Sequence, residues 1–312
     1  MGIKKLEAKE LLEVSSGTQI KGVCLIKDYS VCLTKTGSEF IRGTLTSGEA
    51  TLSFKVWNNS NAFNKLKAEN YTLVPTFIVG KGDFYNGVTS VILQDIEAVE
   101  GFSSSDFLPS LYDIDAYWNG LKDMVYKTLT EKGKTVANAI LFENQGVADR
   151  FKVEFAAKSH HDNCKGGLLV HTYKVVMYTI SFVNTYFKGY SSDFKDLLII
   201  GALVHDIGKI DEMNFGVYTD SSIITHRTLG LKYAEANAEL IKTQYNEHWL
   251  QELKAIIVQH HDEFGDQART IGAYIIFQAD LLDSRLTLIQ QSVAHAVDNR
   301  IKIDDKYLEI FK

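Results

Sequence analysis

The hydrophobic period changes once along this 312-residue chain, and the change separates two kinds of structure. Between residues 18 and 99, short runs rich in Val, Ile, Thr and aromatic residues alternate with polar positions, which is the period of β-strands. Beyond residue 110, apolar residues recur at i, i+3, i+4 and i+7, which is the period of amphipathic helices. The sequence therefore predicts a multidomain α+β protein, with a β-rich unit followed by an all-α bundle.

Five strand-like runs make up the first unit: TQIKGVCLIKDYSVCLT, EFIRGTLTSG, EATLSFKVWN, YTLVPTFIVGKGDFYNG and VTSVILQDIEAVE. The turns SGE and YNG suit hairpins, because Gly and Asn tolerate positive φ. A single helical stretch, NAFNKLKAE, follows the third run. Five strands with a helix at that point predict a small Greek-key barrel of the OB type.

The stretch EGFSSSDFLPS marks the clearest break in the chain, because it clusters Ser and Gly around a proline. We place a barrel domain at residues 1–100, a linker with a lead-in helix at 101–122, and a helical domain at 123–312. The strongest helical runs of the last part lie at 117–131, 171–187, 193–208, 227–244, 247–261 and 268–290.

Charge and cysteine content limit the functional classes. The formal net charge is −6, and residues 1–100 carry 11 Lys and Arg against 11 Asp and Glu. Nucleic-acid binding would therefore need a local groove or bound metal, since bulk charge does not supply it. The odd count of three cysteines, without zinc spacing, predicts reduced thiols in a cytoplasmic protein. The N-terminus lacks an apolar signal core, and no apolar run is long enough to span a membrane.

The stretch GALVHDIGKID places His205 and Asp206 at the end of an apolar helical run. A carboxylate beside a helix core is costly unless it has a partner. Histidine and aspartate recur through the later helices, at His171, His226, His260, His261 and Asp280. Imidazole and carboxylate groups on facing helices are a typical ligand set for Mn, Fe, Zn or Co. We therefore expect a metal centre.

Each of these residues also has a plainer interpretation. Asp280 could be a buried acid paired to Arg285 or to a tyrosine. His226 could be a surface residue behind an N-cap at Thr225, and Lys209 could be an ordinary helix-terminal cation. His260 and His261 point about 100° apart on a helix, so the spacing does not choose between them.

The order His171, His205-Asp206, Asp280, with HDIGK at its centre, resembles the HD superfamily of metal-dependent phosphohydrolases. The stretch AAKSHHDNCKGGLLVHTYKV, together with the preceding OB-like unit, is similar to the YhaM family of 3′→5′ exoribonucleases over nearly the whole chain. The helical motifs carry the resemblance, whereas the barrel matches by pattern only.

The resemblance implies a function and a set of residue roles. The chain would degrade single-stranded RNA, and often single-stranded DNA as well in this family, from the 3′ end to 5′-mononucleotides. Two divalent ions are implied, with Mn expected and Fe, Co, Zn or Mg as alternatives. His171, His205, Asp206 and Asp280 would hold the first ion, and His226 with His260 or His261 the second. Asp206 would bridge the two ions.

The phosphate and the strand would meet further residues. Lys209 and His161 are candidate catalytic residues, and His160 is a candidate contact to the substrate. In the barrel, Trp57, Phe84 and Tyr85 could stack on bases, with Lys55 and Lys81 on neighbouring strands along the phosphates. The plainer interpretation of these aromatic residues is core or hairpin packing.

Two rival functions stay open from sequence alone. The chain could be a phosphohydrolase of small nucleotides, or a non-catalytic OB module with structural metals. The related enzymes are often multimeric, so a homo-oligomer is compatible with the resemblance, but its size does not follow from the sequence.

Overall fold

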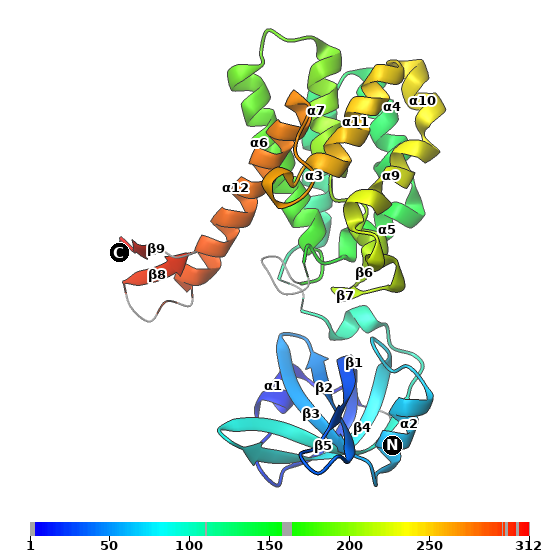
Figure 1. Cartoon of the computed structure of the whole chain (residues 1–312), viewed down its shortest axis with the longest axis vertical. Coiled ribbons are helices and arrows are strands. Elements are labelled where there is room, and N and C mark those ends of the chain that lie inside the picture. Colours follow the sequence, from blue (N-terminus) through cyan, green and yellow to red (C-terminus); the bar gives the residue numbers. More distant parts are fainter. Residues whose placement is uncertain are drawn as a thin grey trace. The chain divides into compact units, whose positions relative to one another are not determined.

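The computed structural model describes residues 4–109, 111–157, 164–294, 296, 299–303 and 306–311. The chain divides into two compact units, Met1–Leu111 and Tyr112–Lys312. This boundary falls within the stretch that the sequence suggested as linker and lead-in helix. Figure 1 shows a strand-rich first unit and a mainly helical second unit.

The first unit is a closed five-stranded barrel. Its strands are β1 (Gln19–Leu33), β2 (Glu39–Ser47), β3 (Ala50–Trp57), β4 (Pro75–Tyr85) and β5 (Val88–Ala98). Around the barrel they follow the order β1-β2-β3-β5-β4. β3 and β5 pair in parallel and the other neighbours are antiparallel. This arrangement, with helix α2 (Asn61–Ala68) between β3 and β4, confirms the predicted OB-like fold.

Close contact between strands in this barrel depends on glycine. A Cβ at Gly43 of β2 would lie 2.2 Å from the carbonyl oxygen of Asp28 and 2.7 Å from the Phe54 ring. Any larger residue would therefore separate β1 from β2 and displace a buried aromatic ring. The core inside the barrel is formed by inward-facing aliphatic residues such as Ile41, Leu45 and Val56. Short elements flank the strands, namely α1 (Ala8–Leu12) and η1 (Ser104–Phe107).

The second unit packs around one buried helix. α7 (Ser192–Val204) is buried on all sides from Asp196 to Val204, as expected for a helix that is apolar around its whole circumference. It contacts α4, α6, α11 and α12. The helices of this unit are α3 (Ile114–Thr128), α4 (Glu131–Ala137), η2 (Asn138–Phe142), α5 (Gln145–Val153), α6 (Gly167–Tyr186), α7, α8 (Lys209–Glu212), η3 (Asp220–Ile223), α9 (His226–Ala236), α10 (Ala238–Gln244), α11 (Glu247–Gln259), η4 (Asp262–Phe264) and α12 (Ile271–Ala294).

The helical runs read from the sequence appear with local differences. The run at 227–244 is interrupted at Asn237, between α9 and α10. His171 lies inside α6 and does not open it, because the helix begins at Gly167 after Gly166, whose φ of +81° is left-handed. Two short hairpins, β6–β7 (Met213–Asn214 with Val217–Tyr218) and β8–β9 (Arg300–Ile303 with Lys306–Glu309), add strands that the helical period did not predict.

Among the residues that the structure describes, none of the helices combines the length and apolar character needed to cross a bilayer.

A buried carboxylate joins three helices of the second unit. Asp196 of α7 accepts hydrogen bonds from the backbone N–H and the hydroxyl of Thr130, which caps α4. It also accepts one from the hydroxyl of Tyr245, at the end of α10, at 2.7 Å. Because burial of an unpaired donor is costly, this carboxylate stabilises the junction of α4, α7 and α10.

Replacing this carboxylate should destabilise the helical unit. We expect Asp196→Ala to lower the free energy of unfolding by about 2–4 kcal/mol, because the partly buried donors of Thr130 and Tyr245 lose their acceptor. Urea unfolding followed by circular dichroism at 222 nm measures this change. Asp193→Ala, on the same helix, removes an exposed ion pair with Lys132 and should cost less than about 1 kcal/mol. Equal effects of the two variants would contradict the assignment.

Candidate metal centre

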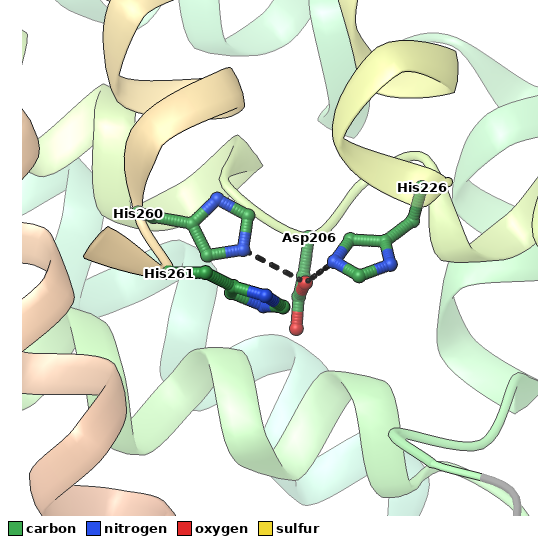
Figure 2. A group of neighbouring side chains, drawn as sticks. All are labelled: Asp206, His226, His260 and His261. Carbon is green, nitrogen blue, oxygen red and sulfur yellow. Dashed lines mark ion pairs between the residues drawn. The ribbon is translucent and has the colours of Figure 1, made fainter. Parts of the chain in front are cut away.

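Asp206 lies at the centre of the histidine-rich cluster and is 2% exposed. α7 ends at Val204, so His205 and Asp206 follow directly from the most buried helix of the unit. Figure 2 shows His226 and His260 pointing at Asp206 from opposite sides, with His261 beside them. Residues far apart in the sequence therefore converge on one carboxylate.

The two oxygens of Asp206 face two different sets of side chains. Oδ2 lies 3.5 Å from Nε2 of His171 and 3.5 Å from Nε2 of His205. Oδ1 lies 3.4 Å from Nε2 of His226 and 3.5 Å from Nε2 of His260. In each set, one ligand atom per residue lies within 4.8 Å of the others, and His261 belongs to the second set. This geometry suits two ions that share Asp206.

Asp280 extends the first set. It projects from α12, and its Oδ1 lies 3.2 Å from Nε2 of His171. This contact gives the partly buried acid a histidine partner within the cluster. The carboxylate is therefore placed where it could also contact an ion held by His171 and His205.

Four histidines have their Nδ1 atom occupied. His205 and His260 donate Nδ1–H to the carbonyls of Ala202 and Ile257, at 2.8 and 2.9 Å. Nδ1 of His171 lies 2.7 Å from a carboxylate oxygen of Asp283, and Nδ1 of His226 lies 3.0 Å from one of Glu212. A hydrogen bond at one ring nitrogen directs the other toward a metal. Nε2 of all four rings therefore faces Asp206.

Within the part of the chain that the structure describes, three buried atoms of the second set have no hydrogen-bond partner: Oδ1 of Asp206, Nε2 of His226 and Nε2 of His260. Such atoms are costly, and a cation would satisfy all three together. The donor set, imidazole nitrogen with carboxylate oxygen, matches transition-metal chemistry. The residues present therefore fit a divalent ion.

The pKa shifts at the centre leave His205 and His261 able to bind a metal ion. Burial lowers the pKa of His205 to about 4, and burial together with His260 lowers the pKa of His261 to about 3. These rings are neutral at pH 7 and keep a free lone pair. Burial would raise the pKa of Asp206, but Lys209 and the histidines hold that pKa well below its usual range. Nζ of Lys209 lies 2.6 Å from Oδ2 of Asp206.

His171 is the exception. Burial opposes its charge, but hydrogen bonds to Asp280 and Asp283 outweigh burial and raise the pKa of His171 to about 10. Without an ion, His171 therefore carries a proton at neutral pH.

The structure brings together all seven residues that the sequence suggested as metal ligands. His171, His205, Asp206 and Asp280 form one set, and His226, His260 and His261 lie around the other oxygen of Asp206. His260 is fully buried and its Nε2 faces Asp206, whereas His261 is partly exposed. His160 and His161 lie outside the described residues.

Of the barrel residues suggested for nucleic-acid binding, Lys55 and Tyr85 line the same groove, and Trp57, Phe84 and Lys81 are not part of its lining. Lys55 and Tyr85 line a groove of about 590 Å³, and the Lys55 ammonium lies 5.6 Å from the Tyr85 ring centroid. Trp57 packs against Phe40, with ring centroids 5.6 Å apart. Phe84 is exposed and lies outside the groove lining.

The expectation that Lys55 and Lys81 occupy neighbouring strands was wrong. Both residues pair with Ile92 of β5, which lies between β3 and β4. The strand order of the barrel, which brings β3 and β5 together in parallel, is a long-range pairing that local sequence does not reveal.

Three residues near these sites were missed from the sequence. Asp283 and Glu212 contact metal-set histidines, and Arg42 lines the barrel groove. Asp283 follows Asp280 by three residues, so the helical period could have placed both on one face. Glu212 and Arg42 have no comparable local signal.

Comparison with known proteins agrees with this geometry. The HD domain model matches residues 168–285, a range that contains every ligand-type residue of both sets. The 3′-5′ exoribonuclease YhaM of Listeria monocytogenes (strain F2365) is 23% identical over 300 residues, covering 92% of each chain. That of Bacillus subtilis (strain 168) is 23% identical over 303 residues, covering 92% of this chain and 91% of the other.

The chain is thus similar over nearly its whole length to proteins of the YhaM family. A mitochondrial single-stranded DNA-binding protein from S. cerevisiae, Rim1, is similar to 27% of this chain and 96% of its own, with 12% identity and a TM-score of 0.24. The barrel of this chain is assigned from its own strand order.

Metal loading should release about one proton at pH 8, because His171 is protonated in the metal-free protein and a ligand nitrogen must be free. Titration calorimetry with Mn²⁺ in two buffers of different ionisation enthalpy measures the number of protons. The released proton should disappear in His171→Ala. Release of no proton from the unaltered chain would contradict the position of His171 in the site.

Proposed function

We propose that this chain is a metal-dependent 3′→5′ exonuclease that degrades single-stranded RNA, and also single-stranded DNA, to 5′-mononucleotides. The observation that carries the proposal is the division of six ligand-type residues into two sets on either side of a seventh, Asp206. The YhaM relatives bear the name 3′-5′ exoribonuclease and match over nine-tenths of the chain. The HD domain supports divalent metal binding.

The metal centre would hold two divalent ions, with Mn as the proposed metal and Fe, Co, Zn or Mg as alternatives. When bound, such ions supply an activated water nucleophile and neutralise charge on the attacked phosphate. His171, His205, Asp206 and Asp280 would hold one ion. His226, His260 and His261 would hold the other with Asp206.

Lys209 is the residue that would contact the substrate phosphate. Its ammonium is largely buried, and Asp206 raises the pKa of Lys209 despite burial, so it stays charged at neutral pH. A fixed positive charge beside the centre would stabilise the charge that develops on a non-bridging phosphate oxygen.

The barrel groove would hold the single strand. Arg42 and Lys55 oppose each other across β2 and β3, and Tyr85 enters the groove from the end of β4. Two cations for phosphates beside an exposed aromatic ring for base stacking are the elements of single-strand binding on OB folds. Trp57, Phe84 and Lys81 remain proposed contacts outside this groove. A homo-oligomer and a cytoplasmic location also remain proposals.

The main test is the fate of a 5′-labelled single-stranded RNA with Mn²⁺. We expect a ladder shortened one nucleotide at a time from the 3′ end, with 5′-mononucleotides as product. A chelator, His205→Ala and Asp206→Ala should each abolish the ladder, because they remove the ions or their ligands.

Two outcomes would reject this activity. An intact oligonucleotide combined with hydrolysis of small nucleotides would identify a nucleotide phosphohydrolase. Metal-loaded protein that binds RNA without any hydrolysis would identify a binding module. A strand blocked at its 3′ end serves as the control for direction, since a 3′→5′ enzyme should leave it undegraded.

Substitutions in the barrel groove should change the affinity for single-stranded nucleic acid. Tyr85→Ala should weaken single-strand binding by about 1–3 kcal/mol through lost stacking. Arg42→Ala should weaken binding and reduce its salt dependence, because a phosphate contact releases counterions. Leu33→Ala, an exposed apolar residue at the end of β1, is the matched control and should have no effect. Fluorescence anisotropy at several salt concentrations measures both changes. Unchanged affinity in Tyr85→Ala would place the strand elsewhere.

A further inference from the structure

Two buried carboxylates lie on the outer side of the metal-centre histidines and do not contact Asp206. Asp283 is 1% exposed and Glu212 is 8% exposed. Each contacts the Nδ1 atom of one histidine, the ring nitrogen that points away from Asp206. The two histidines, His171 and His226, belong to different sets.

Asp283 is held in place by two helices. It lies one turn beyond Asp280 on α12, and its Oδ2 lies 2.7 Å from Nδ1 of His171 on α6. Its other oxygen accepts a hydrogen bond from Thr287 at 3.3 Å and forms an ion pair with Lys174 at 3.4 Å. With both oxygens engaged, Asp283 fixes the ring of His171 in one orientation.

Glu212 holds His226 by both its main chain and its ring. One oxygen accepts the backbone N–H of His226 at 3.0 Å, and the other lies 3.0 Å from Nδ1 of the same residue. Glycine allows the close packing of α8 on α9, since a Cβ at Gly208 would lie 2.0 Å from the carbonyl oxygen of His226. Glu212, at the end of α8, thereby sets where the first residue of α9 points.

We propose that Asp283 and Glu212 are positioning residues that control the two metal sites separately, one carboxylate for each ion. Asp283 sets the affinity of the site formed by His171, His205, Asp206 and Asp280. Glu212 sets the affinity of the site formed by Asp206, His226, His260 and His261. A carboxylate behind a metal-binding histidine orients the ring and raises its basicity. The inference rests on the metal-binding part of the proposed function and needs no assumption about the substrate.

Single-site backgrounds separate the two effects. His226→Ala leaves the His171 site, and His171→Ala leaves the His226 site. In each background, titration calorimetry with Mn²⁺ alone measures the dissociation constant. We expect Asp283→Asn to weaken binding about 10–100-fold in the His226→Ala background and to change it less than about twofold in the His171→Ala background. Glu212→Gln should show the reverse pattern.

A matched control removes a buried carboxylate elsewhere in the same unit. Asp196→Asn changes an acid that is equally buried and hydrogen-bonded but contacts Thr130 and Tyr245. It should leave Mn²⁺ affinity unchanged in both backgrounds, so general destabilisation is distinguished from a positioning effect. Thr287→Val serves as a second variant if Asp283→Asn fails to fold. It removes one hydrogen bond to Asp283 and should produce a smaller loss in the His226→Ala background alone.

The outcomes are distinguishable. Equal losses in the two backgrounds, or no loss in either, would overturn the separate control that we propose. Absence of Mn²⁺ binding in both parent backgrounds would instead reject the metal centre, and with it the proposed function. Each variant could weaken Mn²⁺ binding only in its own background while the unaltered chain fails to degrade RNA. That result would uphold the positioning role and reject the substrate assignment.

Discussion

The helical unit is organised around a carboxylate that is buried next to four imidazoles. Asp206 would be costly at 2% exposure without partners, and both of its oxygens face histidine nitrogens. Ionisation is favoured because Lys209 and the histidines outweigh the cost of burial. The packing of α6, α7, α9, α11 and α12 brings these groups within reach of this one side chain.

Helix ends do much of the orienting in this centre. His205 and His260 each follow the last residue of a helix, and each donates Nδ1–H to the carbonyl three residues earlier, an acceptor left free at a helix C-terminus. His171 and His226 lie at other positions in their helices and use carboxylates for the same purpose. Two kinds of acceptor therefore produce the same result, with Nε2 directed inward.

In the proposed activity, the helical unit would bind the metal ions and the barrel would bind the strand. The helical unit concentrates ligands in a nearly dry interior, where charge interactions are strong. The barrel offers a groove with two cations and an exposed ring, which suits a flexible polyanion of any sequence. Neither the net charge of −6 nor any single motif predicted the position of this groove.

Local sequence determined the two-unit plan, the five strands, most helices and the ligand-type residues, because hydrophobic period and the HDIGK stretch are short-range signals. Tertiary structure decided the rest. It placed β5 between β3 and β4, so that Lys55 and Lys81 are not on adjacent strands. It brought Glu212 and Asp283 behind His226 and His171, and it turned His260, rather than His261, directly toward Asp206. Side-chain direction and strand order depend on contacts between residues far apart in the chain, which no local pattern specifies.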